Sequence, residues 1–288
     1  MTSSTGLLAG LSEIAPRYDA LFCDVWGVVH NGLAAYPRAV EALVAYRKAG
    51  GRVVFITNAP RPSAPIVAML DGFGVPRAAY DGIVSSGDAS RAMIAAYRGR
   101  TVHHVGPPKV DDALFEGLGV TRGPAEAAEV VVVTDLVDDD DTPDMYDGQL
   151  SLWLERSLPM ICANPDKFVE IGEKLVYCAG ALADIYAERG GKVEMAGKPF
   201  PPIYAECLRL AEDAAGHPIG RSRILAIGDS VRTDAVGAAN FDIDLLFITG
   251  SIHAGEIDAF GTPDPGAVRA LVAPSGARLT GFLSRLAW

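Results

Sequence analysis

The stretch ILAIGDSVRTD, residues 224–234, holds the most specific pattern in the chain. Its first four residues, 224–227, predict a buried strand, because a short apolar run bounded by a turn signal is typical of a strand covered on both faces. Gly228 then turns the chain, and Asp229 and Asp234 follow five residues apart. Two carboxylates across a tight loop suit a hard cation such as Mg²⁺, directly or through water. The stretch therefore predicts a strand that ends in a metal-binding loop, with a capped turn as the simpler alternative.

Similar apolar runs occur near the N-terminus. ALFCDV at 20–25 reaches a carboxylate, and VVFIT at 53–57 is β-branched and aromatic, as buried strands are. Helical spacing follows each run, at 38–49 and at 63–73. This β-α-β-α alternation is typical of a parallel sheet with helices on its faces.

A long segment with strands of its own interrupts the alternation. Strand-like runs occur there at 101–105 and 129–134, and the first pattern returns only near residue 200. A segment of this length can fold as an inserted domain. We therefore expect an α/β fold with a Rossmann-like doubly wound parallel-sheet core, residues 1–86 and 193–288, and an inserted α/β cap, residues 87–192.

Several polar side chains are expected where ligands of open parallel sheets bind, at the carboxyl ends of the strands. Asp24 can act as a nucleophile or metal ligand, and Thr57 and Asn58 can hold an anionic oxygen beside a helix start. Lys198 can neutralise a phosphate or a carboxylate. Each residue alone is more often a cap, a turn or a solvated surface group. Only the whole set, in this order, favours a single site.

As a set, these residues resemble the haloacid dehalogenase (HAD) superfamily of hydrolases. Asp24 matches the nucleophile, Thr57 with Asn58 the phosphate-binding position, Lys198 the lysine, and Asp229 with Asp234 the acidic metal motif. The insertion lies where the type 2 caps of that superfamily sit. The segments FITNAPR, SSGDA, ANPD, GKP and GDSVRTDAVGAAN resemble the class IIA branch, the NagD-like or 4-nitrophenylphosphatase-like proteins.

The resemblance implies a Mg²⁺-dependent hydrolase of a small phosphorylated metabolite, such as a sugar phosphate or a nucleotide monophosphate, that acts through an aspartyl-phosphate on Asp24. A phosphate dianion repels a carboxylate, so the metal, Lys198 and hydrogen-bond donors must supply positive charge. The implied metal ligands are Asp24, the backbone carbonyl of Trp26 and Asp229, with Asp234 in the second shell or bound through water.

The sequence departs from the phosphatase pattern at Trp26. The phosphatases carry a second Asp there, which protonates the leaving group and later activates water. An indole N–H cannot act as a general base, and general acid–base catalysis is typically worth about 10²–10⁴-fold. We therefore expect a slow phosphatase, one with a substitute acid–base group, or a protein that binds without turnover. His30 is the nearest candidate substitute, although a packed histidine is the simpler interpretation.

Two other classes of function stay open. The dehalogenases of the superfamily have an aromatic residue at this position and attack carbon without a metal, but GDSVRTD keeps both acids of the metal-dependent motif. Alternatively, the protein is a catalytically impaired phosphate-ligand sensor or a partner-binding protein that kept the metal site. Phosphate release, halide release and binding without turnover distinguish the three.

The cap is expected to close over the site, exclude water and set substrate choice. Its candidate contributors are Asp135, Asn164, Asp166, Lys167 and Lys174, each of which is more often a surface or turn residue.

Composition limits the partners. The chain has 288 residues and a formal net charge of −11, so like-charge repulsion argues against nucleic acids and anionic membranes. No apolar stretch reaches the roughly 18 residues of a membrane helix, and no signal peptide is expected. Four scattered cysteines suit reduced, buried thiols. We expect a cytoplasmic protein that binds a small phosphorylated substrate, no nucleic acid and no membrane, with a homodimer left open.

Overall fold

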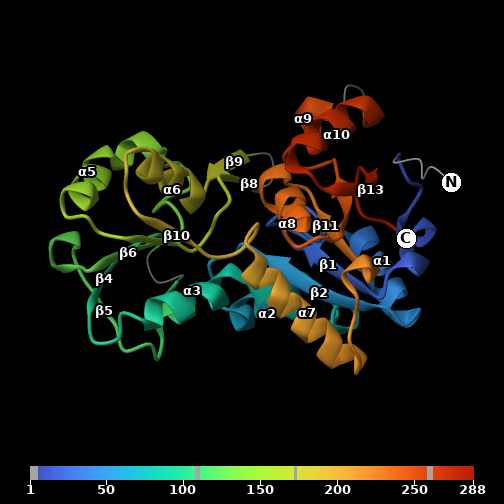
Figure 1. Cartoon of the computed structure of the whole chain (residues 1–288), viewed down its shortest axis with the longest axis horizontal. Helices are drawn as coiled ribbons and strands as arrows, with labels where there is room; N and C mark the ends of the chain where they lie inside the picture. The colour runs from blue at the N-terminus through green and yellow to red at the C-terminus, as the bar shows by residue number, and fades with distance from the viewer. Residues whose placement is uncertain (1–5, 108–110, 172–173, 258–261) are drawn as a thin grey trace.

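The structure is a computed structural model that describes residues 6–107, 111–171, 174–257 and 262–288. Figure 1 shows two parts, each built around a β-sheet, with the chain passing from the first part to the second and back. Both termini lie on the first part, at the end away from the second.

The first part contains a six-stranded parallel sheet with the order β13-β12-β11-β1-β2-β3. The strands are β1 (Ala20–Asp24), β2 (Arg52–Thr57), β3 (Gly82–Ser85), β11 (Ile224–Gly228), β12 (Asp244–Ile248) and β13 (Arg278–Leu283). The neighbouring strands β11, β1 and β2 pair in a parallel register in which Asp24 lies beside Ile56 and Cys23 beside Ile227. Their carboxyl ends therefore meet at one edge of the sheet.

Helices cover both faces of this sheet. Because successive side chains of a strand point to opposite faces, Leu21 and Cys23 pack in one apolar cluster, while Phe22 packs in another. The first cluster includes α1 (Pro37–Lys48) and α2 (Ser63–Gly72), and the second includes α7 (Pro201–Ala215), α8 (Val236–Asn240), α9 (Ala254–Ile257) and α10 (Pro265–Val272). The predicted doubly wound α/β core is therefore confirmed.

The second part contains a five-stranded parallel sheet with the order β10-β7-β6-β4-β5. Its strands are β4 (Thr101–Val105), β5 (Thr121–Arg122), β6 (Val130–Val133), β7 (Met160–Cys162) and β10 (Val193–Met195), and its helices are α3 (Ser86–Ala95), α4 (Asp112–Phe115), α5 (Asp147–Glu155) and α6 (Ala179–Glu188). A separate antiparallel hairpin consists of β8 (Phe168–Ile171) and β9 (Lys174–Tyr177). Trp153 is fully buried in the core of this part.

The pairing of β10 concerns the boundary between the two parts. The strand β10 pairs with β7 of the second sheet, although the predicted core segment begins at residue 193. We therefore propose to keep the division into a discontinuous core and an inserted cap, with β10 assigned to the cap. We call the two parts the core and the cap from here on.

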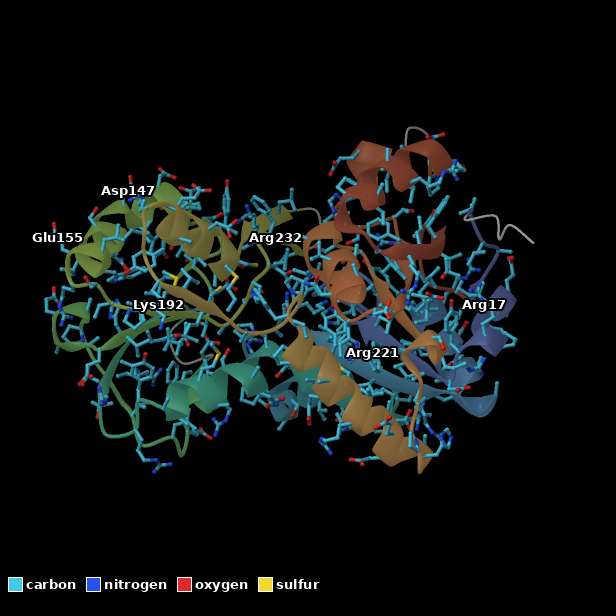
Figure 2. The ribbon with its side chains drawn as sticks, in the orientation of Figure 1. Arg17, Asp147, Glu155, Lys192, Arg221 and Arg232 are labelled. Carbon is cyan, nitrogen blue, oxygen red and sulfur yellow. The ribbon has the colours of Figure 1, made fainter. Side chains whose placement is uncertain are left out.

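Several charged side chains mark the ends of the molecule. Asp147 and Glu155 of the cap and Arg17 of the core lie exposed at opposite ends of the molecule (Figure 2). All four cysteines are free and buried, as predicted. Within the described ranges, no helix combines the length and apolarity that crossing a membrane requires.

Candidate active site

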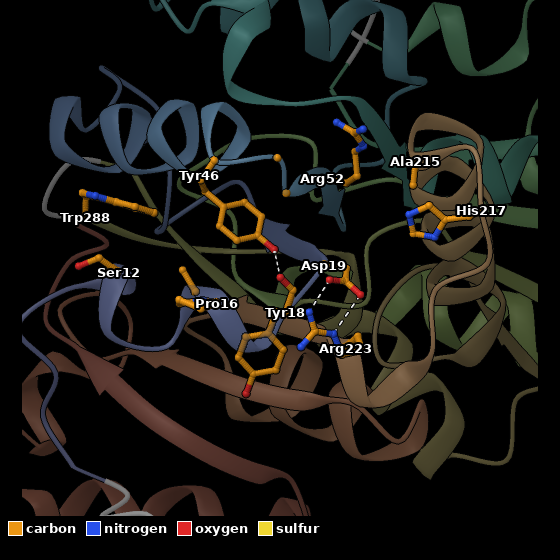
Figure 3. Close-up of a pocket in the computed structure, with 14 residues that line it drawn as sticks. Ser12, Pro16, Tyr18, Asp19, Tyr46, Arg52, Ala215, His217, Arg223 and Trp288 are labelled. Atoms are coloured by element: carbon orange, nitrogen blue, oxygen red, sulfur yellow. Dashed lines mark hydrogen bonds and ion pairs between the residues drawn. The ribbon is translucent and has the colours of Figure 1, made fainter.

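Two cavities lie against the core sheet, one at the amino ends of its strands and one at their carboxyl ends. One of about 410 Å³ adjoins Asp19, Arg52 and Arg223, which stand at or just before the first residues of their strands (Figure 3). The ion pair between Asp19 and Arg223 occupies part of this edge. The predicted catalytic residues line the other cavity, at the carboxyl ends of the strands, where ligands of parallel sheets bind.

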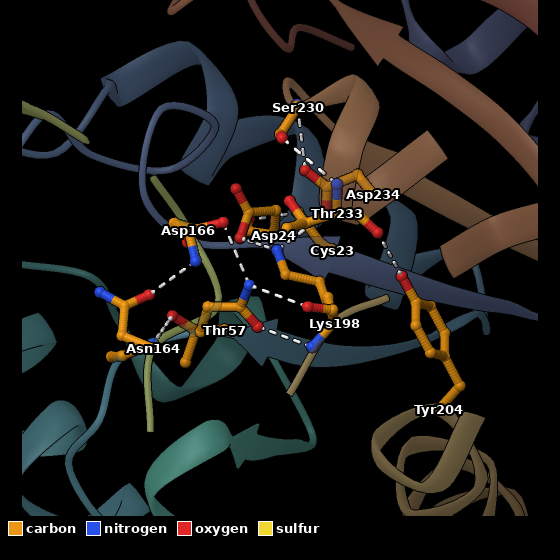
Figure 4. Close-up of polar contacts among 12 residues, drawn as sticks. Cys23, Asp24, Thr57, Asn164, Asp166, Lys198, Tyr204, Ser230, Thr233 and Asp234 are labelled. Atoms are coloured by element: carbon orange, nitrogen blue, oxygen red, sulfur yellow. Dashed lines mark hydrogen bonds and ion pairs between the residues drawn. The ribbon is translucent and has the colours of Figure 1, made fainter. Parts of the chain in front are cut away.

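The sheet order brings the predicted residues together. Asp24 ends β1, Thr57 ends β2 and Asp229 follows β11, and these three strands are neighbours. Figure 4 shows the side chains of Asp24, Asp234 and Lys198 converging at this point. Residues separated by up to about two hundred positions in the sequence therefore share one site.

Lys198 lies at the centre of the site. Its side chain is only 2% exposed, and its Nζ donates to Oδ1 of Asp24 at 2.6 Å and to Oδ1 of Asp234 at 2.7 Å. Burial disfavours the ammonium, but Asp234 and Asp24 outweigh this and raise the pKa of Lys198 well above its usual value. The site therefore holds a permanent positive charge.

Three buried carboxyl groups surround this charge. Asp24, Asp229 and Asp234 each offer one oxygen, and these oxygens lie within 4.8 Å of one another. Burial raises the pKa of Asp24 well above its usual value and that of Asp229 to about 7, and the neighbouring carboxylates add to both shifts. One ammonium cannot balance three carboxylates. An oxygen-lined site with excess negative charge fits a hard divalent cation such as Mg²⁺.

Gly27 allows the loop after β1 to approach the metal-binding loop. Its φ is +82°, and a Cβ atom at this position would lie 2.0 Å from Oδ2 of Asp229. A larger residue would displace the Asp229 carboxylate. Gly27 thus brings the backbone that follows Trp26 close to the acidic cluster.

Both carboxylate oxygens of Asp234 accept hydrogen bonds. Its Oδ1 accepts from Lys198, and its Oδ2 accepts from the backbone N–H of Ser230 at 3.1 Å. The residue lies in a π-helical turn, η7 (Val231–Ala235), which α8 continues. Because both oxygens are engaged, the geometry favours contact with a metal through water.

Asn58 connects three segments. Its Oδ1 accepts from the backbone N–H of Lys198 at 2.7 Å, and its Nδ2 donates to Oδ1 of Asp166 at 3.1 Å. The hydroxyl of Thr57 accepts from the N–H of Ala59 at 3.2 Å, which leaves its proton available to donate. The sequence predicted that both Thr57 and Asn58 contact phosphate. In the structure both polar atoms of the Asn58 amide are engaged within the protein, so contact with phosphate stays a prediction that fits Thr57 better than Asn58.

Trp26 and His30 pack against each other. Their ring centroids lie 5.1 Å apart in an edge-to-face arrangement, and a Cβ on Gly32 would lie 2.6 Å from the indole Cζ2. The Nδ1 of His30 accepts from the N–H of Gly32 at 2.9 Å, and burial lowers the pKa of His30 to about 4. The ring is therefore neutral near pH 7, with its proton on Nε2. Because the basic nitrogen is engaged, the structure argues against His30 as the substitute acid–base group.

The cap completes the cleft, whose volume is about 300 Å³. Of its predicted contributors, Asp135, Asn164 and Asp166 line the cavity. Lys167 instead pairs with Asp184, and Lys174 with Asp140. Three further groups that the sequence did not suggest also line it: Arg61 after β2, Asp111 before α4, and apolar side chains of the β8–β9 hairpin. The FITNAPR segment contains Arg61, but its spacing carries no signal for that role.

One ion pair joins the cap to the metal-binding loop. Arg232 of η7 donates to Asp184 of α6 at 2.6 Å, and Asp184 also pairs with Lys167. Figure 2 places Arg232 where the two parts meet. Together with the contact between Asn58 and Asp166, this pair holds the cap over the site.

Comparison with known proteins identifies the family of the chain. A family model of haloacid dehalogenase-like hydrolases matches residues 21–121, and a HAD-hydrolase-like model matches residues 195–273. The crystal structure of a haloacid dehalogenase-like family hydrolase from Brucella suis 1330 is 42% identical, with a TM-score of 0.86, and the match covers 97% of this chain and 100% of that one. The chain belongs to the haloacid dehalogenase-like hydrolases. It is an enzyme of the HAD-type phosphatase/hydrolase class.

Two more distant structures share the fold. The p-nitrophenyl phosphatase from Archaeoglobus fulgidus is 19% identical with a TM-score of 0.66, over 94% of this chain and 97% of that one. A glycerol phosphate phosphatase from Mycobacterium tuberculosis, in complex with magnesium, is 22% identical with a TM-score of 0.62, over 88% of this chain and 77% of that one. The fold is thus that of the class IIA branch that the sequence motifs resemble.

Proposed function

We propose that this protein is a Mg²⁺-dependent phosphatase of a small phosphorylated metabolite and that it acts through an aspartyl-phosphate on Asp24. The observation that carries the proposal is the convergence of three buried carboxyl groups, within 4.8 Å of one another, on a buried lysine. The magnesium complex of the more distant glycerol phosphate phosphatase supports the choice of metal.

Several core residues contribute to the first step, the transfer of the phosphoryl group to Asp24. Lys198 is bonded to Oδ1 of Asp24, so we assign Oδ2 to the attack on phosphorus. The ammonium and the Thr57 hydroxyl would contact the phosphate oxygens, where negative charge is concentrated. The phosphorus–oxygen bond of the ester then breaks, and the leaving alkoxide departs toward the cap.

The metal would be held by Asp24, Asp229 and the backbone carbonyl of Trp26, with Asp234 contacting it through water. Bound there, Mg²⁺ would neutralise phosphate charge that otherwise repels the incoming carboxylate.

The absence of an acid–base group at position 26 should limit the rate of both chemical steps. Trp26 cannot protonate the leaving alkoxide or activate the water that hydrolyses the aspartyl-phosphate. Esters of poor leaving groups should therefore react slowly, and esters of good leaving groups, such as 4-nitrophenyl phosphate, should react faster. Trp26 also favours a second candidate function, a catalytically impaired phosphate-ligand sensor on the same fold.

The test is release of phosphate from 4-nitrophenyl phosphate with and without Mg²⁺, for the wild type and for Asp24→Asn. We expect Mg²⁺-dependent release that Asp24→Asn abolishes while the fold is kept, as circular dichroism measures. Full activity of Asp24→Asn would refute the mechanism. Binding of Mg²⁺ and phosphate without any release would favour the sensor, and halide release without Mg²⁺ a dehalogenase.

A further inference from the structure

We propose that the cap forms a subsite for a positively charged, partly apolar leaving group, so that the substrate is the phosphate ester of an amino or ammonium alcohol. The inference rests on the proposed phosphatase function and extends it by naming the class of alcohol.

The subsite is the cap side of the catalytic cleft. The cavity that contains Asp24 continues between loops and the hairpin of the cap, and its total volume is about 300 Å³. This is at the lower end of the range for small-molecule sites, about 300–1,000 Å³. The space left after phosphate binding therefore suits a compact alcohol.

Negative charge dominates this side of the cleft. Asp111, Asp135 and Asp139 line it, and among the described lining residues the cations are Lys198, which is bonded to the catalytic carboxylates, and Arg61. Arg61 has its nearest carboxylate partner in Asp111, at 3.9 Å. Because carboxylates outnumber cations on this side, an alcohol that carries a carboxylate or a second phosphate is disfavoured relative to a cationic one.

Asp135 is a lining carboxylate without an ion-pair partner among the described residues, although the charge of Arg61 acts on it. It follows β6, is half-buried, and accepts one hydrogen bond, from the N–H of Leu136 at 3.1 Å. Within the described part of the chain, no lysine, arginine or histidine forms an ion pair with it. Burial raises the pKa of Asp135 to about 7, and the nearby Asp111 and Asp139 add to the shift. A cationic ligand would supply the charge that favours the ionised form.

The β8–β9 hairpin supplies apolar surface to the same cavity. Phe168, Val169, Ile171 and Val176 line it, and Phe168 is 42% exposed. An aromatic face beside a carboxylate is the combination that binds ammonium groups, because the ring quadrupole attracts the cation while methyl and methylene groups pack on apolar side chains. Charge and surface chemistry therefore point to the same class of alcohol.

The test compares two esters of the same shape. Phosphocholine carries a quaternary ammonium, and 3,3-dimethylbutyl phosphate is its neutral carbon isostere. We expect kcat/KM to be about tenfold higher for phosphocholine, the size of effect that a close charge pair gives, and lower still for the anionic 3-phosphoglycerate than for the isostere. Asp135→Asn should bring the ratio of phosphocholine to isostere close to one, because phosphocholine should lose much more of its kcat/KM than the isostere does. The control is Asp147→Asn, which removes an exposed cap carboxylate outside the cleft.

Two results would overturn the inference. One is an equal kcat/KM for the two esters in the wild type. The other is an equal loss of kcat/KM for both esters in Asp135→Asn, which would make Asp135 a catalytic group instead. Calorimetry of both esters on the Mg²⁺-loaded Asp24→Asn protein measures the same preference without turnover. Absence of phosphate release from any ester would refute the proposed function alone, while equal binding of the two esters would refute the subsite alone.

Discussion

At the residue scale, the rate of the proposed reaction depends most on Trp26. The position follows the nucleophile by two residues, and the ring packs against His30 and Gly32. The neighbouring histidine cannot compensate, because its Nδ1 is bonded and its pKa is low. The resemblance to the superfamily identified Trp26 as a departure from the phosphatase pattern, but the hydrogen bond and burial of His30 could be read only from the structure.

Replacing Trp26 with aspartate should restore acid–base catalysis. We expect Trp26→Asp to raise kcat for an alkyl phosphate ester by up to about 10²-fold, and to raise it much less for 4-nitrophenyl phosphate, whose leaving group needs little protonation. Steady-state kinetics with both esters measures this difference. Trp26→Ala is the matched control, since it removes the ring without adding a carboxyl group. Equal rates for the two variants would mean that the acid is not the limiting defect.

Lys198 should be as important for stability as for activity. Lys198→Met leaves three buried carboxyl groups without their ammonium, and removal of one partner from a buried ion pair typically costs about 3–5 kcal/mol. Urea denaturation without added metal measures this loss. Lys192→Met, at a lysine whose side chain is 72% exposed, should be close to neutral. If both variants are equally stable, the buried cluster does not depend on Lys198 for charge balance.

At the element scale, most core strands were predictable, whereas the two strands of the cap hairpin were not. VVFIT and ILAI became β2 and β11, as the pattern of a strand buried on both faces predicts. The hairpin β8–β9 reads FVEI and KLVY, and four residues with one charged position each give too weak a signal. The candidate residues at the ends of the core strands could therefore be named from the sequence, while the cap surface that lines the cleft could be named only in part.

The loop after β6 should make stability depend on pH. Asp135 has a raised pKa of about 7 in the folded protein, so its protonated form favours folding. This contribution is fully present below the ordinary carboxyl pKa, and it is lost as the pH rises through about 7. Because the group is partly exposed to the cleft, we expect Asp135→Asn to be about 1–2 kcal/mol more stable than the wild type at pH 8, and equal to it near pH 4.

Thermal or urea denaturation of the two proteins across this pH range measures the difference. Asp147→Asn again serves as the control, because it removes an exposed cap carboxylate that lies outside the cleft. A stability difference that does not change between pH 4 and pH 8 would contradict the assigned titration.

At the scale of the whole molecule, one active site is assembled from two parts. In the proposed function, the core supplies the nucleophile, the lysine and the metal-binding acids, and the cap supplies Asp135, Asp166 and the hairpin. The division into a core and an inserted cap stays a prediction from the order of the motifs, in which the insertion separates Thr57 from Lys198. Some of the acidic residues form the buried cluster of three carboxyl groups, and others line the cap side of the cleft.

The most direct test of the central claim is to locate the phosphoryl group during turnover. Without a general base at position 26, hydrolysis of the aspartyl-phosphate should be slow, so the intermediate should accumulate. Acid quenching during turnover of 4-nitrophenyl phosphate, followed by peptide mass spectrometry, should find phosphate on the peptide that contains Asp24. The adduct should require Mg²⁺ and be absent from Asp24→Asn. Turnover with the phosphoryl group on another residue, or with Asp24 unmodified throughout, would contradict the account.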